Sequence, residues 1–129
     1  MLLLWLNGIC ELALELLKML ERPDVKLCAP VLFKFEFANA IRKYLVRGIL
    51  NREITDEILA EIGKIPIEYK VMTWGNVEEA FNCAVKKNIT VYDAIYVILA
   101  KKLAGKFVTA DTKLCSSLSD ESNVILITD

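Results

Sequence analysis

Histidine is absent from this 129-residue sequence, and cysteine occurs only four times. Without histidine, the Ser-His-Asp and Cys-His catalytic arrangements are excluded, and imidazole is not available as a metal ligand. The cysteines show no C-x-x-C spacing, so zinc sites of the finger or ribbon kind are not expected. Each has apolar neighbours, which favours buried free thiols; they are Cys10, Cys28, Cys83 and Cys115.

Long apolar runs and excess charge of one sign are lacking as well. The most apolar stretch, residues 89–100, has twelve residues, whereas a membrane-spanning helix needs roughly 20. Residues 1–6 resemble the apolar part of a signal peptide, but no basic segment precedes them and no small-residue cleavage site follows. We therefore expect a cytoplasmic protein without a membrane segment. The formal net charge is −1, so any nucleic-acid partner has to be held by a local basic patch.

The spacing of apolar residues predicts one domain, residues 1–129, in which helices alternate with short strands. Helices are expected over residues 8–22, 31–47, 51–62, 77–87, 91–104 and 112–118, and strands over residues 25–29, 67–72, 106–110 and 123–128. This alternation is typical of an α/β fold with a central parallel sheet. Apolar residues make up 55% of the chain, a share that predicts self-association through apolar helical surface in the N-terminal half.

Three local features follow from the same pattern. Pro30 is expected to stop the strand before it and to occupy the first turn of the next helix. Residues 74–76 are expected to form a loop. The helix over residues 77–87 is expected to bury one apolar face, made of Val77, Ala80, Phe81, Ala84 and Val85.

The helix over residues 91–104 is the most apolar element and is expected to be a buried core segment. Thr90 is its predicted N-cap, and Gly105 is expected to end it in the left-handed conformation. Asp93 then lies in the first turn, where a negative charge is favoured by the helix dipole. One interpretation gives Asp93 only that electrostatic role, and the other makes it part of a site.

Two further isolated carboxylates favour a site. Asp111 stands at the end of a predicted strand, and Glu36 lies early in the helix after another strand. In an open parallel sheet, ligands bind beyond the carboxyl ends of the strands, so Glu36, Asp93 and Asp111 are predicted to converge there. Clustered carboxylates without histidine suit hard cations such as Mg²⁺ or Mn²⁺. The alternative is that the three positions are unrelated.

Three blocks of sequence carry a family resemblance: F-E-F-A-N-A at residues 35–40, T-V-Y-D-A at 90–94 and V-T-A-D at 108–111. They resemble signature blocks of the PIN-domain ribonucleases, and especially of the VapC-like toxins of prokaryotic toxin–antitoxin pairs. The resemblance implies a three-layer sandwich with strand order 3-2-1-4-5. It also implies an endoribonuclease that uses Mg²⁺ or Mn²⁺, an RNA substrate, an antitoxin partner and a homodimer.

The same resemblance assigns roles to individual residues. It makes Glu36, Asp93 and Asp111 the metal-binding and catalytic carboxylates, and it gives Asn39 and Thr109 supporting positions in that site. Basic residues near these blocks are candidates for contacts with the RNA backbone, although ordinary solvation also accounts for them; the three selected are Arg42, Lys43 and Lys113.

The start of the chain departs from the family pattern. The family opens with an apolar strand that ends in Asp, and residues 1–6 align with the segment after that strand. The first acidic residue here is Glu11. Three readings are open: the start is placed too late, the protein is a degenerate member, or residues 1–6 are drawn into the vacant strand position. Impaired catalysis is expected, and a truncated, non-catalytic module for protein binding is the alternative function.

Overall fold

The computed structural model describes residues 2–5, 26–109, 112–121 and 124–126. Five short strands in these residues form one parallel sheet, with the order β3-β2-β1-β4-β5. This order confirms the 3-2-1-4-5 prediction. The strands are β1 (Leu2–Trp5), β2 (Leu27–Pro30), β3 (Ile67–Lys70), β4 (Lys106–Thr109) and β5 (Val124–Leu126).

The central strand β1 corrects the expectation that the family's first strand is missing. Leu2 pairs with Leu27 of β2 on one side and with Lys106 of β4 on the other. The start of the chain is therefore drawn into the central position, as the third reading supposed. A vacancy there would leave the N–H and C=O groups of two strands unpaired, which is costly inside a protein. The predicted helix over residues 8–22 lies outside the described residues.

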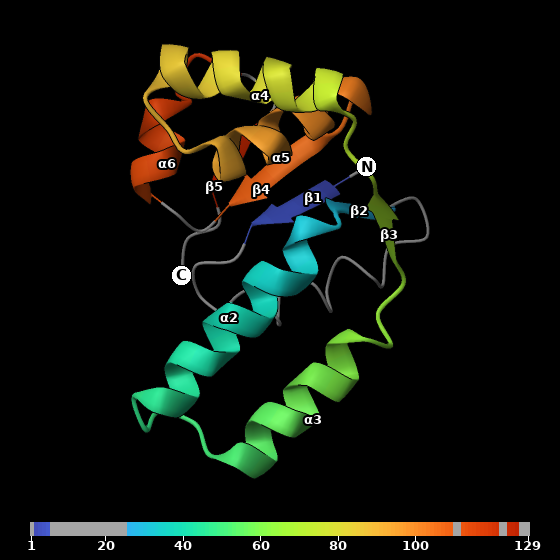
Figure 1. Ribbon diagram of the computed structural model, residues 1–129, viewed down its shortest axis with the longest axis vertical. Coiled ribbons are helices and arrows are strands. Elements are labelled where there is room, and N and C mark those ends of the chain that lie inside the picture. The colour runs from blue at the N-terminus through green and yellow to red at the C-terminus, as the bar shows by residue number, and fades with distance from the viewer. Residues whose placement is uncertain (1, 6–25, 110–111, 122–123, 127–129) are drawn as a thin grey trace.

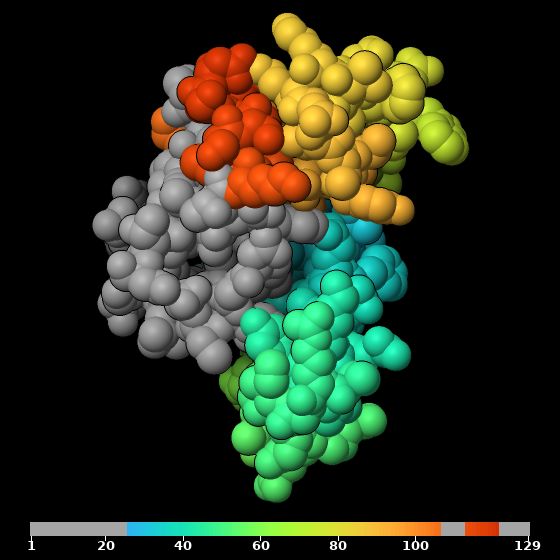
Figure 2. Space-filling view, turned by 90° about the vertical axis from the view of Figure 1, so that its left-hand side faces the viewer, coloured from blue at the N-terminus to red at the C-terminus, as the bar shows by residue number. Residues whose placement is uncertain are grey.

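The sheet is flanked by helices, as predicted. Figure 1 shows α2 and α3 on one side of it and α4, α5 and α6 on the other. In the space-filling view, α2 and α3 form the lower end of the molecule, and α4 and α6 form the upper end (Figure 2). None of the helices within the described ranges has the length and apolar character to cross a membrane. The helices are α2 (Leu32–Val46), α3 (Arg52–Ile62), α4 (Trp74–Lys87), α5 (Val91–Lys102) and α6 (Thr112–Ser117).

Helix α5 forms the centre of the core, as its apolar sequence predicted. It packs against three strands, β1, β2 and β4, and against α4. Tyr96, Val97 and Ala100 are completely buried. Phe33 and Phe37 on the inner face of α2 belong to the same apolar cluster. This packing fixes the start of α5 relative to α2.

Pro30 does not play the role that the sequence suggested. It is the last residue of β2 and pairs with Lys70, and α2 begins only at Leu32. The backbone N–H of Val31 donates to the carbonyl of Lys70 over 3.1 Å, so pairing with β3 continues past the proline. At the end of a strand, a proline removes only one hydrogen-bond donor from the ladder, and it is tolerated there.

Helix α4 departs from the prediction in both its start and its buried face. Residues 74–76 are its first turn, because Thr73 caps the helix and forms a capping box with Asn76. Ala80 and Ala84 are buried against α5, as expected. The predicted burial of Phe81 and Val85 is wrong, since their exposed fractions are 57% and 69%. Two alanines allow α4 to approach α5 closely, and this contact turns the neighbouring large residues outward.

The end of α5 also differs in detail. The left-handed residue is Ala104, with φ of 49°, and not Gly105. The N–H of Gly105 instead donates to the carbonyl of Ala100 over 2.9 Å. This 6→1 bond closes the helix by the usual C-terminal pattern with alanine in place of glycine.

Candidate active site

The candidate site lies where α2 and α5 meet beyond the carboxyl ends of the strands. Glu36 is in the second turn of α2, which follows β2 directly. Asp93 is in the first turn of α5. A single groove is lined by Pro30 at the end of β2, Lys70 at the end of β3 and Tyr92 at the start of α5. The start of α5 therefore lies at the carboxyl edge of the sheet, where the sequence placed it.

Tyr96 connects the two helices at this edge. Its hydroxyl donates a hydrogen bond to Oε1 of Glu36 over 3.1 Å. Tyr96 is completely buried, and it follows Asp93 by three residues on the same side of α5. Tyr96 is not among the site residues predicted from the sequence. The available signal was a tyrosine in an apolar helix, because a buried tyrosine hydroxyl usually has a hydrogen-bond partner.

Burial and a neighbouring charge oppose ionisation of Glu36. Removal of its carboxyl group from water, helped by the negative charge of Asp93, raises the pKa of Glu36 from 4.5 to about 7. The hydrogen bond from Tyr96 acts in the opposite direction, since it stabilises the carboxylate. Burial and the nearby Glu36 carboxylate hold the pKa of Tyr96 far above its usual value. The phenol therefore stays protonated and remains a donor to Glu36.

Asp93 is positioned by the N-terminal cap of its helix. Its backbone N–H donates to the hydroxyl oxygen of Thr90 over 3.1 Å, which confirms Thr90 as the N-cap. The first turn is thus fixed by a side-chain bond at the residue that carries the carboxylate. The helix dipole also favours the negative charge of Asp93 at this position.

The remaining predicted site residues divide into two groups. Asp111 and the side chain of Thr109 lie outside the described residues, although Thr109 itself is the last residue of β4. The others are exposed: Asn39, Arg42 and Lys43 on α2, and Lys113 on α6.

Glu36 and Asp93 are a suitable donor set for a hydrated Mg²⁺ or Mn²⁺ ion. Within the described part of the chain, no group of three or more His, Cys, Asp or Glu side chains is arranged to hold a metal. Mg²⁺, however, usually keeps several waters and binds through one or two carboxylates together with substrate phosphates. The negative charge of Asp93 also opposes ionisation of Glu36, and a cation bound by the two carboxylates would remove that cost.

An apolar groove of about 410 Å³ is lined by the starts of α2 and α5, the two helices that carry the carboxylates. Phe35 and Tyr92 line it, and each directly precedes a carboxylate in the sequence. Their exposed fractions are 68% and 60%. Val71, with an exposed fraction of 83%, lines the same groove. The candidate site therefore opens beside an apolar surface.

The family model for the PIN domain matches residues 5–116. The chain belongs to the PIN-domain family. This match confirms the family resemblance of the three blocks, all of which lie within the matched region. It covers all of β4 and most of α6, as well as both helices that carry the carboxylates.

Two proteins of Pyrobaculum aerophilum are similar to this chain. Ribonuclease VapC3 is 38% identical over 81 residues, which cover 62% of this chain and 62% of that protein. The alignment thus spans less than two thirds of the relative. The crystal structure of PAE2754 is similar with a TM-score of 0.72 and 22% identity, over 96% of this chain and 88% of that one. This second similarity confirms the fold.

Proposed function

We propose that this protein is a metal-dependent endoribonuclease of the VapC toxin kind. The observation that carries the proposal is the Glu36–Tyr96 hydrogen bond beside Asp93, at the carboxyl edge of a PIN-domain sheet. The name of the relative Ribonuclease VapC3 supports RNA as the substrate.

Each side chain has a distinct task in this proposal. Glu36 and Asp93, with Asp111 from the end of β4, bind Mg²⁺ or Mn²⁺. Such an ion lowers the pKa of a water and neutralises charge on a phosphate in the transition state. Tyr96 holds one oxygen of Glu36 by its hydrogen bond and leaves the other oxygen for the ion. Asn39 and Thr109 support the site, and Lys43 of α2 and Lys113 of α6 bind the RNA backbone.

The proposed partners are an antitoxin and a second copy of the chain. The apolar surface beside the site, which includes Phe35, Val71 and Tyr92, is the part of the described surface best suited to a second copy. An antitoxin that covers the same edge blocks access of RNA to the carboxylates. We place the activity in the cytoplasm, together with its RNA substrate.

Cleavage of a fluorescent single-stranded RNA in Mn²⁺, in Mg²⁺ and in EDTA tests this function. We expect slow cleavage with either metal, because the family's first Asp has no counterpart here, and none in EDTA. Glu36→Gln, Asp93→Asn and Asp111→Asn should each abolish it, because each removes a charged ligand. Glu57→Gln changes an exposed carboxylate on α3 and should cleave at the original rate. Metal-independent cleavage, or loss in the Glu57 variant as well, counts against the proposal.

A non-catalytic protein-binding module is the second candidate. It is favoured by one feature of the sequence: no acidic residue precedes Glu11, so the family's first Asp has no counterpart at the end of β1. Under this alternative, the purified chain forms dimers or binds an antitoxin but cleaves no RNA with any divalent metal. The cleavage assay above therefore separates the two candidates.

A further inference from the structure

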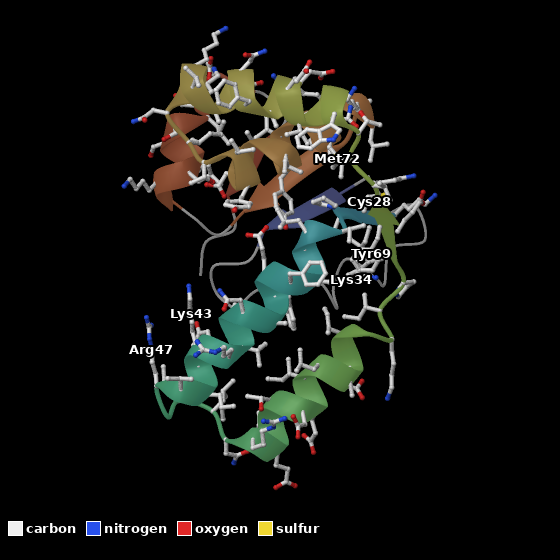
Figure 3. All side chains as sticks on the ribbon, viewed as in Figure 1. Cys28, Lys34, Lys43, Arg47, Tyr69 and Met72 are labelled. Atoms are coloured by element: carbon white, nitrogen blue, oxygen red, sulfur yellow. The ribbon has the colours of Figure 1, made fainter. Side chains whose placement is uncertain are left out.

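A polar ridge runs along α2 from the candidate site toward the far end of the helix. Its members are Glu36, Asn39, Lys43 and Arg47, at spacings of three, four and four residues. Such spacings keep side chains on one side of a helix, and they place Lys43 and Arg47 roughly 10 and 16 Å from Glu36 along the axis. Figure 3 shows Lys43 and Arg47 projecting from the side of α2 that is turned away from α3. The ridge therefore connects the carboxylates to two cations.

The cations of this ridge are not neutralised by the described part of the protein. Lys43 and Arg47 are exposed, and neither forms an ion pair with a described residue. Many other cations do have carboxylate partners: Lys26, Arg52, Lys64, Lys70, Lys87, Lys101 and Lys102. Lys34, also on α2, lies 4.4 Å from the ring centroid of Tyr69. Positive charge thus remains available where the ridge leaves the site.

The acidic residues of the neighbouring helix α3 do not form ion pairs with Lys43 or Arg47. Helix α3 packs against α2 and carries four acidic residues, two of which pair with cations near them. Lys43 and Arg47 face away from this source of partners (Figure 3). Because the whole chain has a net charge of −1, an anionic polymer gains little from the overall field, and a local ridge decides where it binds.

We propose that the Asn39–Lys43–Arg47 ridge of α2 guides the sugar-phosphate backbone of single-stranded RNA to Glu36 and Asp93. This inference rests on the proposed ribonuclease function and names the path of its substrate. Arg42 is excluded from the path, although it is exposed and close in sequence, because it lies roughly 120° around the helix from Glu36. Arg42 and Lys43, although adjacent in the sequence and both exposed, therefore have different roles.

Fluorescence anisotropy of a labelled oligouridine tests the path without cleavage. The full chain is titrated in EDTA at several salt concentrations, and the slope of log K against log salt is measured. Each phosphate contact on a single strand contributes about 0.7 to the magnitude of this slope. Lys43→Gln with Arg47→Gln should therefore lower the magnitude by about 1.4 and weaken binding equally for oligonucleotides of different sequence.

Two control variants make the result specific. Arg42→Gln removes the same charge from the same helix and should leave the slope unchanged. Lys43→Arg with Arg47→Lys keeps both charges and should retain the original slope. Circular dichroism verifies that all variants are folded, which is expected for exposed polar positions.

The proposal is overturned if the double glutamine variant keeps the original slope. It is equally overturned if Arg42→Gln lowers the magnitude of the slope as much, per charge removed, as the double glutamine variant does. It is also overturned if the unmodified chain does not bind oligouridine at low salt. The ribonuclease function is judged separately by metal-dependent cleavage. If metal-dependent cleavage persists while the double glutamine variant keeps the original slope, the ribonuclease function stands and the RNA follows another path.

Discussion

Glu36 is a carboxylate whose protonation is coupled to the stability of the fold. Its pKa of about 7 in the folded protein exceeds the ordinary value of 4.5. The folded state therefore binds this proton more tightly than the unfolded state does. The resulting stabilisation is complete below the unfolded pKa and is lost as the pH rises through about 7. Without a metal, ionisation of Glu36 therefore lowers the free energy of unfolding at alkaline pH.

We expect Glu36→Gln to stabilise the metal-free protein above pH 7. Glutamine resembles the protonated carboxyl group, and the pKa difference, reduced for the partial exposure of Glu36 to solvent, corresponds to roughly 2–3 kcal/mol at pH 8. Urea unfolding in EDTA at pH 5 and pH 8 measures the effect, which should fall to about 1 kcal/mol or less at pH 5. Glu57→Gln is the matched control and should change little at either pH. An equal gain at both pH values contradicts the assigned cause.

Tyr96→Phe removes only the hydroxyl that donates to Glu36. We expect a loss of about 1 kcal/mol, as is usual for one buried hydrogen bond. Because this bond lowers the pKa of Glu36, the variant should need a higher pH to reach the same Mn²⁺ affinity. Electron paramagnetic resonance of free Mn²⁺ across pH 6–9 measures the shift. Tyr44→Phe, a partly buried tyrosine of α2, should leave the pH profile unchanged.

At the scale of the secondary-structure elements, the N-terminal cap of α5 fixes the site as well as the helix. Thr90 accepts the N–H of Asp93, whereas Thr73 makes the equivalent bond to Asn76 at the start of α4. The sequence predicted the first cap and missed the second. Thr90 stands before a clear apolar run, but residues 74–76 include a glycine and an asparagine, which also favour loops.

The two caps provide a matched pair of variants. Thr90→Ala and Thr73→Ala should each destabilise the protein by about 1 kcal/mol in thermal or urea unfolding. Only Thr90→Ala should also weaken Mn²⁺ binding, because it loosens the turn that carries Asp93. Thr90→Ser should restore both properties. Equal Mn²⁺ affinity in the two alanine variants would show that the cap does not position Asp93.

At the scale of the whole molecule, apolar side chains remain exposed around the candidate site. Phe35, Val71 and Tyr92 line one groove, and Trp74, with an exposed fraction of 82%, begins α4 three residues after Val71. Contiguous apolar surface of this kind marks an interaction site more often than plain solvent contact. A second copy seated there brings two candidate sites close to one interface.

We expect the protein to be a dimer in multi-angle light scattering at micromolar concentration. Val71→Asp combined with Trp74→Glu should give monomers, because a charge buried at an apolar contact is costly. Val46→Asp changes another exposed valine, at the end of α2, and should leave the dimer intact. A monomer mass for the unmodified chain, or dissociation by Val46→Asp, argues against this interface.

The sequence by itself determined the family, the kind of sheet and most helices. The blocks around Glu36, Asp93 and Asp111 identified the PIN domain because they combine polar residues with apolar surroundings at family-specific positions. Amphipathic spacing predicted α2 and α3 within one or two residues. These features depend on local sequence, where apolar period, caps and breakers act over a few residues.

Only the tertiary structure decided which segment fills the centre of the sheet and which groups meet at its edge. The strand β1 forms because β2 and β4 both need a hydrogen-bonding partner, a demand that residues 2–5 do not reveal on their own. The contact between Tyr96 and Glu36 joins residues 60 positions apart. The outward turn of Phe81 and Val85 depends on how closely two alanines let α4 approach α5. Each outcome is set by long-range packing, because burial and pairing are properties of neighbours that lie far away in the sequence.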